Sequence, residues 1–523
     1  MTTEIRIESL ADVTRAHAEA RGAKPALIFE GRTTTFAELD RRASQVANGL
    51  IAAGLKPQAR VAYLDKNSDR FFEALFGATK ANDVLVAVNW RLAPPEVAYV
   101  VNDAMAEVLF VGQEFFPIVE KILPDLKTVK KVIALDGSHE GWESFDAWRD
   151  AQSSNDPHLE IKPDDVAIQM YTSGTTGHPK GAQLTNENFL SLLPGATKEW
   201  GKVWTADDVN LVCMPLFHIA GSGWGIVGLY AGASAIIIRD IIPPEILKAI
   251  PQYGVTRALF VPAVLLFLVQ TPGVESTDFS TLQFIAYGAS PIPLDLLRTA
   301  ITTFKCEFAQ LYGLTETTGA VTYLPPEDHD PNGNQRMRSC GRAIAGAVIR
   351  IVDAEGEELP TGEVGEIIVK SRQNMKGYWN LPDETAKAIR GEWFHTGDAG
   401  YMDADGYLYI HDRVKDMIVS GGENVYPAEV ESALFGHPAI ADVAVIGVPD
   451  DRWGEAVKAI VVKKPGAEVD PADIIAFARE RIAGYKVPKS VDFADVLPRN
   501  PSGKILKREL REPYWAGRDR QVN

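Results

Sequence analysis

A segment rich in glycine, serine and threonine that ends in a lysine is the first candidate for chemistry in this sequence. It runs Tyr171-Thr-Ser-Gly-Thr-Thr-Gly-His-Pro-Lys180-Gly181 and follows an apolar run, Val166–Met170, which indicates a buried strand. Glycines let a backbone close around an anion, hydroxyl and N–H groups donate to phosphate oxygens, and a lysine adds positive charge. The segment is not the Walker pattern, because no Ser or Thr follows Lys180 and the glycine spacing differs. It predicts a phosphate cradle; the alternative is a flexible surface loop, in which the same residue types are common.

Polar residues also follow three other predicted strands. His218 comes just past 211–214, Gly288-Ala-Ser290 follows 284–287, and Gly313-Leu-Thr-Glu316 follows 308–312. Sites of α/β proteins gather beyond the carboxyl ends of strands, so these residues are candidates for a common site. A histidine among apolar residues is as often structural, and a lone Glu316 is normally solvated. A Thr-Glu pair at this place can instead contact phosphate and magnesium, because magnesium prefers carboxylate and phosphate oxygens.

Two further candidates stand in turns of the second half. Asp398, in Trp393-Phe-His-Thr-Gly-Asp398, can accept hydrogen bonds from a sugar diol, although an Asp after Gly is more often a turn residue. Lys504 follows the turn Pro498-Arg-Asn-Pro-Ser-Gly and is solvated unless another domain faces it across a cleft. The charged run His411–Asp416 lies between two apolar segments and predicts a linker between domains.

Alternating strands and helices in the first half predict how these residues are positioned. Segments 26–29 and 32–34 form a hairpin pattern, and Thr35 with Glu38 makes a capping box for an amphipathic helix that stops at Gly54. Strands are predicted at 61–64, 84–88, 108–111 and 132–135, with a helix at 71–81. This order predicts crossover connections and a largely parallel sheet buried on both faces. The polar stretch 137–157 predicts an irregular loop between subdomains.

The pattern changes near Val348. Segments 348–352 and 366–369 alternate with Gly- and Asp-rich turns, which predicts antiparallel strands of a small barrel. After the linker, helices at 427–435 and 471–482 and strands at 443–448, 456–462 and 491–493 predict a compact α+β unit. The predicted fold class is α/β: a large N-terminal region of βα-layered subdomains plus a small β-barrel-like subdomain, followed by a smaller α+β C-terminal domain.

Length and charge narrow the classes of function. A chain of 523 residues exceeds one simple core and should divide into at least two domains. The net charge of −17 disfavours nucleic-acid binding and an anionic membrane surface, although a local patch leaves peripheral membrane contact open. Three scattered cysteines show no metal spacing and fit a reducing cytoplasm. The start of the chain gives no signal peptide, and the most apolar run, 258–269, is too short to span a bilayer.

Taken in order, the motifs resemble the adenylate-forming superfamily of acyl-CoA synthetases, luciferases and carrier-loading adenylation domains. Each motif is weak alone and together they are specific: Tyr171–Gly181, Pro215-Leu-Phe-His218, Tyr312-Gly-Leu-Thr-Glu316, Thr396-Gly-Asp398, Asp412-Arg-Val-Lys-Asp416, Ser420-Gly-Gly-Glu-Asn424 and Pro498–Lys504. They cover nearly the whole chain, and the closest resemblance is to bacterial fatty-acid–CoA ligases, with aryl-CoA ligases nearby. The resemblance implies an AMP-binding domain, residues 1–414, and a mobile C-terminal domain, residues 415–523, with its hinge at Lys415.

The resemblance further implies a two-step ligation that uses ATP, Mg²⁺ and CoA. A carboxylate attacks the α-phosphate of ATP and gives an acyl-adenylate and pyrophosphate, and the CoA thiol then displaces AMP. The protein would mainly orient the reactants and neutralise charge. Lys504 would bridge the carboxylate and the α-phosphate, where charge develops. Thr315 would contact the α-phosphate, Glu316 the Mg²⁺, and His218 would gate the acyl pocket.

The remaining candidates follow from the same resemblance, position by position. The β- and γ-phosphates would be held by Thr172, Ser173, Gly174, Thr175, Thr176 and Lys180. Adenine would lie between Gly288, Ala289, Ser290, Gln310, Leu311 and Tyr312, and the ribose hydroxyls would meet Asp398 and Arg413. The second domain pose would bring in Ser420, Gly421 and Gly422, with Trp453 on the CoA nucleotide unless it is a half-buried packing residue. The acyl pocket would involve Trp224, Phe260, Val261, Gly288, Gly313, Thr318 and Gly319.

Three functions are considered for this sequence. The first is a CoA ligase for a small-molecule carboxylic acid: a medium- to long-chain fatty acid, with an aromatic or polycyclic acid as the alternative. The small residues Gly288, Gly313 and Gly319 indicate a deep pocket and hence an extended or bulky acid. The second is a stand-alone adenylation enzyme that loads a carrier protein. The third, a non-catalytic nucleotide-binding relative, is disfavoured because Lys180, Glu316, Asp398 and Lys504 are all retained. A homodimer is the default expectation for the assembly.

Overall fold

The chain folds around two large sheets, seen in a computed structural model that describes residues 7–172, 179–330, 332, 335–413, 416–420, 423–450, 453–499 and 505–516. The first sheet has the order β19-β9-β8-β4-β3-β5-β6-β7. Its strands are β3 (Arg60–Leu64), β4 (Val84–Ala87), β5 (Ala106–Val111), β6 (Lys131–Ala134), β7 (Glu143–Ser144), β8 (Val166–Thr172), β9 (Lys180–Thr185) and β19 (Gly377–Tyr378). From β8 to β7 the strands are parallel, and β9 and β19 are added antiparallel at one edge.

The second sheet has the order β16-β15-β14-β13-β12-β10-β11-β1-β2. Its strands are β1 (Pro25–Phe29), β2 (Arg32–Thr35), β10 (Val209–Val212), β11 (Ser234–Ile237), β12 (Arg257–Phe260), β13 (Phe284–Gly288), β14 (Glu307–Leu314), β15 (Gly319–Leu324) and β16 (Arg342–Ala343). The run from β14 to β1 is parallel. Both sheets therefore present the carboxyl ends of parallel strands, where sites of this fold class form.

Helices of the first 304 residues cover these sheets. They are α1 (Ala11–Arg21), α2 (Phe36–Ala52), α3 (Asp69–Lys80), α4 (Pro94–Asp103), α5 (Phe116–Ile122), α6 (Phe145–Asp150), α7 (Asn186–Glu199), α8 (Ile219–Tyr230), α9 (Pro243–Tyr253), α10 (Pro262–Gln270) and α11 (Leu294–Phe304). One continuous apolar core extends from Leu10 to Phe394 and takes in side chains of both sheets. A second core, which includes Leu64 and Val97, lies on the α4 and α5 side of the first sheet. Parallel strands covered on both faces explain the near-continuous apolar runs in the sequence.

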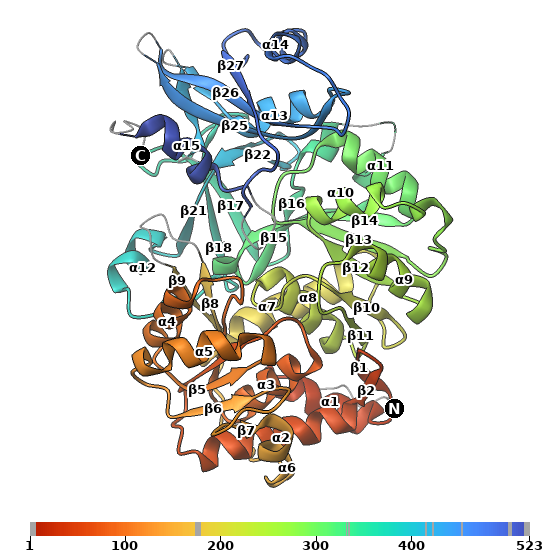
Figure 1. Ribbon diagram of the computed structural model, residues 1–523, viewed down its shortest axis with the longest axis vertical. Coiled ribbons are helices and arrows are strands. Elements are labelled where there is room, and N and C mark those ends of the chain that lie inside the picture. The colour runs from red at the N-terminus through yellow and green to blue at the C-terminus, as the bar shows by residue number, and fades with distance from the viewer. Residues whose placement is uncertain are drawn as a thin grey trace.

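Two smaller sheets follow. The third is antiparallel and contains β17 (Ala347–Val352), β18 (Gly365–Ser371), β20 (Ile389–Arg390), β21 (Trp393–Met402) and β22 (Leu408–Arg413), beside α12 (Pro382–Ala388). The fourth contains β23 (Ile418–Ser420), β24 (Glu423–Val425), β25 (Ile440–Asp450), β26 (Gly454–Lys463) and β27 (Ser490–Phe493), with α13 (Pro427–Phe435), α14 (Pro471–Arg479) and α15 (Lys507–Trp515). Figure 1 shows this C-terminal unit at one end of the molecule, opposite α1 and α2.

The C-terminal unit has apolar cores of its own. One includes Ile418, Val445 and Ile474, and the other includes Ile446, Ile460 and Leu497. Separate cores are what a domain that moves as a rigid body requires. They support the predicted division of the chain, although the boundary at residues 414 and 415 stays a prediction, because both residues lie outside the described ranges.

Most predicted elements are confirmed. The capping box is present, because the Thr35 side chain accepts a hydrogen bond from the Glu38 backbone N–H and the Glu38 carboxylate accepts one from the Thr35 N–H. The predicted helix at 427–435 agrees residue for residue with α13. No helix in the described ranges is long and apolar enough to cross a membrane.

Four predictions need correction. The stretch 137–157 contains β7 and α6, because Ser144 caps a helix whose Phe145 and Trp148 are buried on one face. The run His411–Asp416 is not all linker, since its first three residues continue β22. The helix predicted to reach residue 482 ends at Arg479. The antiparallel strands near Val348 are confirmed, but the pairings among the described strands form an open sheet and not a barrel.

Candidate active site

The carboxyl ends of β8 and β14 meet at Glu316. This residue lies in the short 3₁₀ turn Thr315–Thr317 that follows β14, and its carboxylate is buried at 8% exposure. The Glu316 Oε1 atom accepts hydrogen bonds from the Thr172 hydroxyl at 3.0 Å and from the Tyr378 hydroxyl at 3.0 Å. Thr172 is the last residue of β8, so the contact joins the two large sheets. The structure thus brings together two of the predicted site residues from positions 144 apart in the sequence.

Lys180 lies beside this cluster at the start of β9. Its ammonium group is ion-paired with Glu384 of α12 and lies 5.1 Å from the centre of the Tyr378 ring. Glu384 also accepts a hydrogen bond from Lys387 at 2.7 Å. Hydrogen bonds from Lys180 and Lys387 lower the pKa of the Glu384 carboxyl to about 2. The candidates Ser173, Gly174, Thr175 and Thr176 lie outside the described residues, so their phosphate role stays a prediction.

A second buried carboxylate, Asp398, lies on β21. The Tyr312 hydroxyl donates to Asp398 Oδ2 at 2.8 Å, and the Asp398 backbone N–H donates to the Thr396 hydroxyl at 3.0 Å. The Thr396 hydroxyl in turn donates to the Ile367 carbonyl at 2.7 Å, which ties this part of β21 to β18. Asp398 thus lies within a strand and not in a turn. Arg413 is the backbone partner of Asp398 across β21 and β22. Tyr312 therefore links the predicted adenine wall to the predicted ribose carboxylate.

The rest of the predicted adenine wall is built by neighbouring strands. Gly288 of β13 is the register partner of Leu311 of β14. A Cβ atom at Gly288 would lie 2.0 Å from the Leu311 carbonyl oxygen, so only glycine fits there. Ala289, with φ of 67°, turns the chain away from the strand, and Ser290 follows half-buried. Gln310 is buried, and its amide contacts the Cys340 sulfur at 3.6 Å.

His218 caps the N-terminus of α8 with its backbone, and its ring lies in an apolar surrounding. The ring centroid is 4.5 Å from that of Phe217, and among the described residues its buried Nε2 atom has no hydrogen-bond partner. Burial, together with the nearby positive charge of Arg91, lowers the pKa of His218 to about 4. The imidazole is therefore neutral at pH 7. An uncharged ring facing apolar side chains suits an apolar substrate better than one that carries an amine.

Asn67, which sequence reasoning missed, holds the loop that carries His218. Its side-chain NH₂ donates to the carbonyls of Cys213, Met214 and Ile238 at 3.3, 3.1 and 3.0 Å. Its Oδ1 atom accepts from the Leu216 N–H at 2.9 Å, and the residue is 3% exposed. One amide thus joins the end of β3 to the ends of β10 and β11. No motif marks Asn67, because its partners are 146 to 171 residues away.

Asn67→Asp should therefore damage both stability and catalysis. The carboxylate would face three carbonyl oxygens that have lost their donor, which we expect to cost about 2–4 kcal/mol of unfolding free energy. The variant should also lower kcat, because displacement of the loop would move His218 out of its position at the predicted acyl pocket. Asn102→Asp is the matched control, because Asn102 also bridges backbone groups but lies at the surface. Thermal unfolding and steady-state kinetics of both variants test this; equal effects of the two would contradict a special role for Asn67.

Most of the predicted acyl-pocket residues are buried, while Gly313 and Gly319 are partly exposed, and two of the glycines are explained without a deep pocket. Trp224 and Phe260 are 3% and 0% exposed, and Val261 and Thr318 are buried as well. A Cβ at Gly313 would lie 1.8 Å from the Gly319 carbonyl oxygen, so close approach of β14 and β15 requires this glycine. Gly288 is likewise required by a close approach of backbones, here of β13 and β14 at the Leu311 carbonyl oxygen. At Gly319 a Cβ would meet only Leu192 and Ile219, at 3.6 and 3.8 Å, so this position faces apolar side chains.

Of the C-terminal candidates, the structure describes Ser420 and Trp453. Ser420 is buried where β23 pairs with Gly454, and Trp453 is 39% exposed. The hinge residue Lys415, the glycines Gly421 and Gly422, and the predicted catalytic residue Lys504 lie outside the described residues. The ends of the segment that holds Lys504 are joined, since the Leu506 N–H donates to the Pro498 carbonyl at 2.8 Å. Their roles therefore stay predictions.

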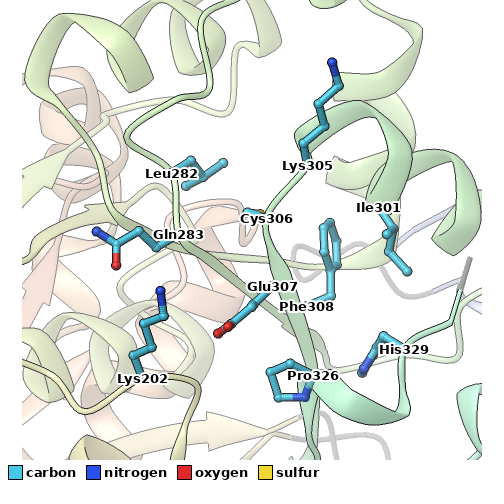
Figure 2. A pocket seen from close by; sticks show the side chains of 10 residues that line it. All are labelled: Lys202, Leu282, Gln283, Ile301, Lys305, Cys306, Glu307, Phe308, Pro326 and His329. Carbon is cyan, nitrogen blue, oxygen red and sulfur yellow. The ribbon is translucent and has the colours of Figure 1, made fainter.

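One cavity in the described part lies away from this site. Its volume is about 460 Å³, and it lies at the amino ends of β13 and β14. Figure 2 shows the side chains that line it. Its lining mixes Lys202, Lys305 and Glu307 with apolar Leu282 and Phe308. Because the candidate residues occupy the opposite ends of the same strands, this cavity is separate from them.

The donor set fits Mg²⁺ bound together with phosphate. In the described ranges no group of three or more His, Cys, Asp or Glu side chains could hold a metal alone. Mg²⁺ is commonly held by one or two carboxylates plus substrate phosphates. Glu316 uses only its Oε1 atom for the hydrogen bonds from Thr172 and Tyr378, and Lys180 lies next to Tyr378. A carboxylate, hydroxyls and a lysine in one place can bind a magnesium-bound polyphosphate.

Comparison with known proteins gives two family matches. Residues 14–379 match the AMP-binding enzyme family, and residues 429–504 match the C-terminal domain of AMP-binding enzymes. The two matches flank the predicted linker and occupy most of the sequence.

Individual relatives extend over nearly the full chain. A fatty acid–[acyl-carrier-protein] ligase of Streptomyces coeruleorubidus is 42% identical over 99% of this chain and 99% of its own. A long-chain-fatty-acid–CoA ligase of Mycobacterium tuberculosis is 38% identical over 92% of this chain and 93% of its own. The crystal structure of an anthranilate–CoA ligase with anthranoyl-AMP is similar with a TM-score of 0.91 and 29% identity, covering 98% of both chains.

Proposed function

The chain belongs to the family of AMP-binding enzymes, and from this premise we propose that it joins a medium- to long-chain fatty acid to CoA. The protein is an AMP-forming ligase of the adenylate-forming superfamily that uses ATP and Mg²⁺. Which acid it activates and which thiol accepts the acyl group belong to the proposal.

The contact of Glu316 with Thr172 and Tyr378, next to Lys180, carries the proposal. In the first step Lys180 and the hydroxyl of Thr172 would hold the β- and γ-phosphates, while Glu316 would bind Mg²⁺, which neutralises phosphate charge. Asp398 would accept hydrogen bonds from the ribose, held in place by Tyr312 and Thr396. The residues then do little covalent chemistry; they fix the α-phosphate where a carboxylate can attack it.

Lys504 would supply positive charge to the attacking carboxylate and the α-phosphate as the acyl-adenylate forms. A fixed cation is most effective where charge develops in the transition state. For the second step the C-terminal domain would turn about Lys415, withdraw Lys504 and bring Ser420, Gly421 and Gly422 to the site. The His218 ring would move aside to let the thiol reach the acyl-adenylate. Because the ring is neutral, it places no charge beside the acyl chain.

A fatty acid is supported by the apolar setting of His218 and by two relatives. The ring lies against Phe217, and Gly319 faces Leu192 and Ile219. Two of the relatives are named for fatty acids, while the similar crystal structure holds an aromatic adenylate. An aromatic or polycyclic acid is therefore the alternative substrate.

A second candidate function is transfer of the acyl group to a carrier protein. It is favoured by one observation, the 42% identity over 99% of both chains with a ligase named for an acyl-carrier protein. The chemistry of the first step is the same for both functions. The two differ only in whether the attacking thiol belongs to free CoA or to a protein-bound phosphopantetheine.

The test is AMP formation with MgATP across fatty acids of increasing length, benzoates, cinnamates and polycyclic acids. Each acid is assayed with free CoA and separately with a holo acyl carrier protein. Our proposal predicts the highest kcat/KM for a fatty acid with CoA. A maximum for an aromatic acid, or AMP release with the carrier protein alone, would replace the proposal with the corresponding alternative.

We also expect the enzyme to act in the cytoplasm and to form a homodimer, and peripheral membrane contact is compatible with an apolar substrate. The three cysteines, Cys213, Cys306 and Cys340, are not joined in disulfides, as a reducing compartment would require. Fractionation and light scattering test these expectations directly.

A further inference from the structure

Lys180 is paired within the protein, although its predicted ligand is a phosphate. Its ammonium group contacts Glu384 Oε2, and the two side chains are only 11% and 20% exposed. An ion pair shielded to this degree is screened weakly by salt. Lys180 therefore has a strong resident partner when no substrate is bound.

The position of Glu384 is fixed by its surroundings. β19 pairs with β9, with Gly377 opposite Gln183 and Tyr378 opposite Ala182, so the segment before α12 is attached to the strand that begins at Lys180. The Trp379 N–H donates to the Gly181 carbonyl at 2.8 Å. The Thr385 hydroxyl donates to the Leu381 carbonyl and accepts from the Tyr378 N–H at 2.9 Å, which holds the first turn of α12.

A second lysine acts on the same carboxylate from the solvent side. Lys387 donates to Glu384 Oε1 at 2.7 Å and is 71% exposed. The Glu384 carboxylate therefore lies between a shielded lysine and an exposed one. Its low pKa, caused first by the hydrogen bond from Lys180 and then by that from Lys387, keeps it charged at any physiological pH.

We propose that Glu384 is a resident counter-ion that competes with the β- and γ-phosphates for Lys180 and recaptures the lysine when pyrophosphate leaves. This inference rests on the proposed phosphate role of Lys180. Binding of MgATP then exchanges one anionic partner of the ammonium group for another. The apparent affinity for MgATP equals the intrinsic affinity multiplied by the fraction of molecules in which Lys180 is available, so it is lower when Glu384 holds the lysine. The cost in ATP affinity is matched by easier release of pyrophosphate, which carries the same phosphates.

The test measures ligand binding to the free enzyme by calorimetry. For Glu384→Gln we expect the Kd of MgATP and of magnesium pyrophosphate to fall about tenfold, because Lys180 is no longer occupied. The Kd of AMP, which lacks the β- and γ-phosphates, and the KM of the acid should not change. Pyrophosphate should inhibit the variant more strongly, and kcat should not rise.

Asp383→Asn is the matched control. Asp383 precedes Glu384 in the same turn, is exposed, and is neither hydrogen-bonded nor ion-paired within the described ranges. Asp383→Asn removes the same charge as Glu384→Gln. It should alter the affinity for MgATP by less than about twofold, as expected for a screened surface charge. Lys387→Met should act in the opposite direction and weaken MgATP binding, because Glu384 would then pair with Lys180 alone.

Lys180→Met separates the inference from its premise. If this variant binds MgATP as well as the unchanged protein does, the phosphate role of Lys180 fails and the inference fails with it. If Lys180→Met weakens MgATP binding but Glu384→Gln leaves it unchanged or weakens it, the phosphate role stands and Glu384 is a positioning residue and not a competitor. If Glu384 had only a structural role, Glu384→Gln would lower the melting temperature of the protein and weaken the binding of AMP as well.

Discussion

Lys504→Ala should lose adenylate formation while it keeps most of the thioester step. In the first step the ammonium group would stabilise charge that develops between the carboxylate and the α-phosphate, and loss of one such group costs about 100- to 1,000-fold in rate. In the second step the proposed domain rotation moves Lys504 away, so the reaction of CoA with preformed acyl-adenylate should change by less than about threefold. Acid-dependent exchange of pyrophosphate into ATP measures the first step, and rapid mixing of synthetic acyl-adenylate with CoA measures the second.

Lys464→Ala is the control for this variant. Lys464 is an exposed lysine of the same C-terminal unit, in the turn after β26, and its removal changes the charge equally. Both half-reactions should proceed there at the normal rate. If Lys504→Ala slowed both half-reactions to the same extent, the residue would have no role specific to adenylation.

Glu316→Gln should raise the magnesium requirement and lower kcat by about 100-fold, since a charged group at the phosphates is replaced by a neutral one of equal size. The amide oxygen can still accept the hydrogen bonds from Thr172 and Tyr378, so the fold around the site should survive. The measurement is the rate of AMP formation as a function of Mg²⁺ concentration. A right-shifted curve that high Mg²⁺ partly restores is the expected result.

Tyr378→Phe separates charge from hydrogen bonding at the same carboxylate. It removes one hydrogen bond, from the neutral Tyr378 hydroxyl to Glu316, and keeps the charge of the carboxylate. We expect about a tenfold loss at most, with an unchanged dependence on Mg²⁺. A larger magnesium shift in Tyr378→Phe than in Glu316→Gln would contradict the assignment of Glu316 as the metal ligand.

Elements with a strong local signal could be predicted from the sequence. Thr35 with Glu38 predicted the start of α2, and the apolar run 166–170 predicted β8. Both signals are local, because capping and periodicity depend on neighbours in the chain. The region 137–157 was missed because one short helix with two buried aromatic residues is hidden in a polar stretch. The open third sheet could not be told from a barrel, since closure depends on which strands pair and not on their pattern.

The candidate site was predictable only where a motif marks it. Glu316 stands in a recognisable motif after β14 and Asp398 in one within β21, whereas no motif marks Tyr378, Glu384 or Asn67. Their partners lie 62 to 204 residues away, so no local pattern reveals the contacts. The deep pocket inferred from small residues stays a prediction, because the close approach of neighbouring backbones is by itself enough to require glycine at Gly288 and Gly313.

One site of this enzyme should perform adenylation first and thioester formation second. The most direct test is a rapid-quench experiment with a long-chain fatty acid and radiolabelled ATP, first without CoA and then with CoA added. We expect an enzyme-bound acyl-adenylate and one equivalent of pyrophosphate before CoA is added, followed by acyl-CoA and AMP in equal amounts after its addition. Pyrophosphate without any CoA-dependent release of AMP, or AMP formation that needs no acid, would contradict it.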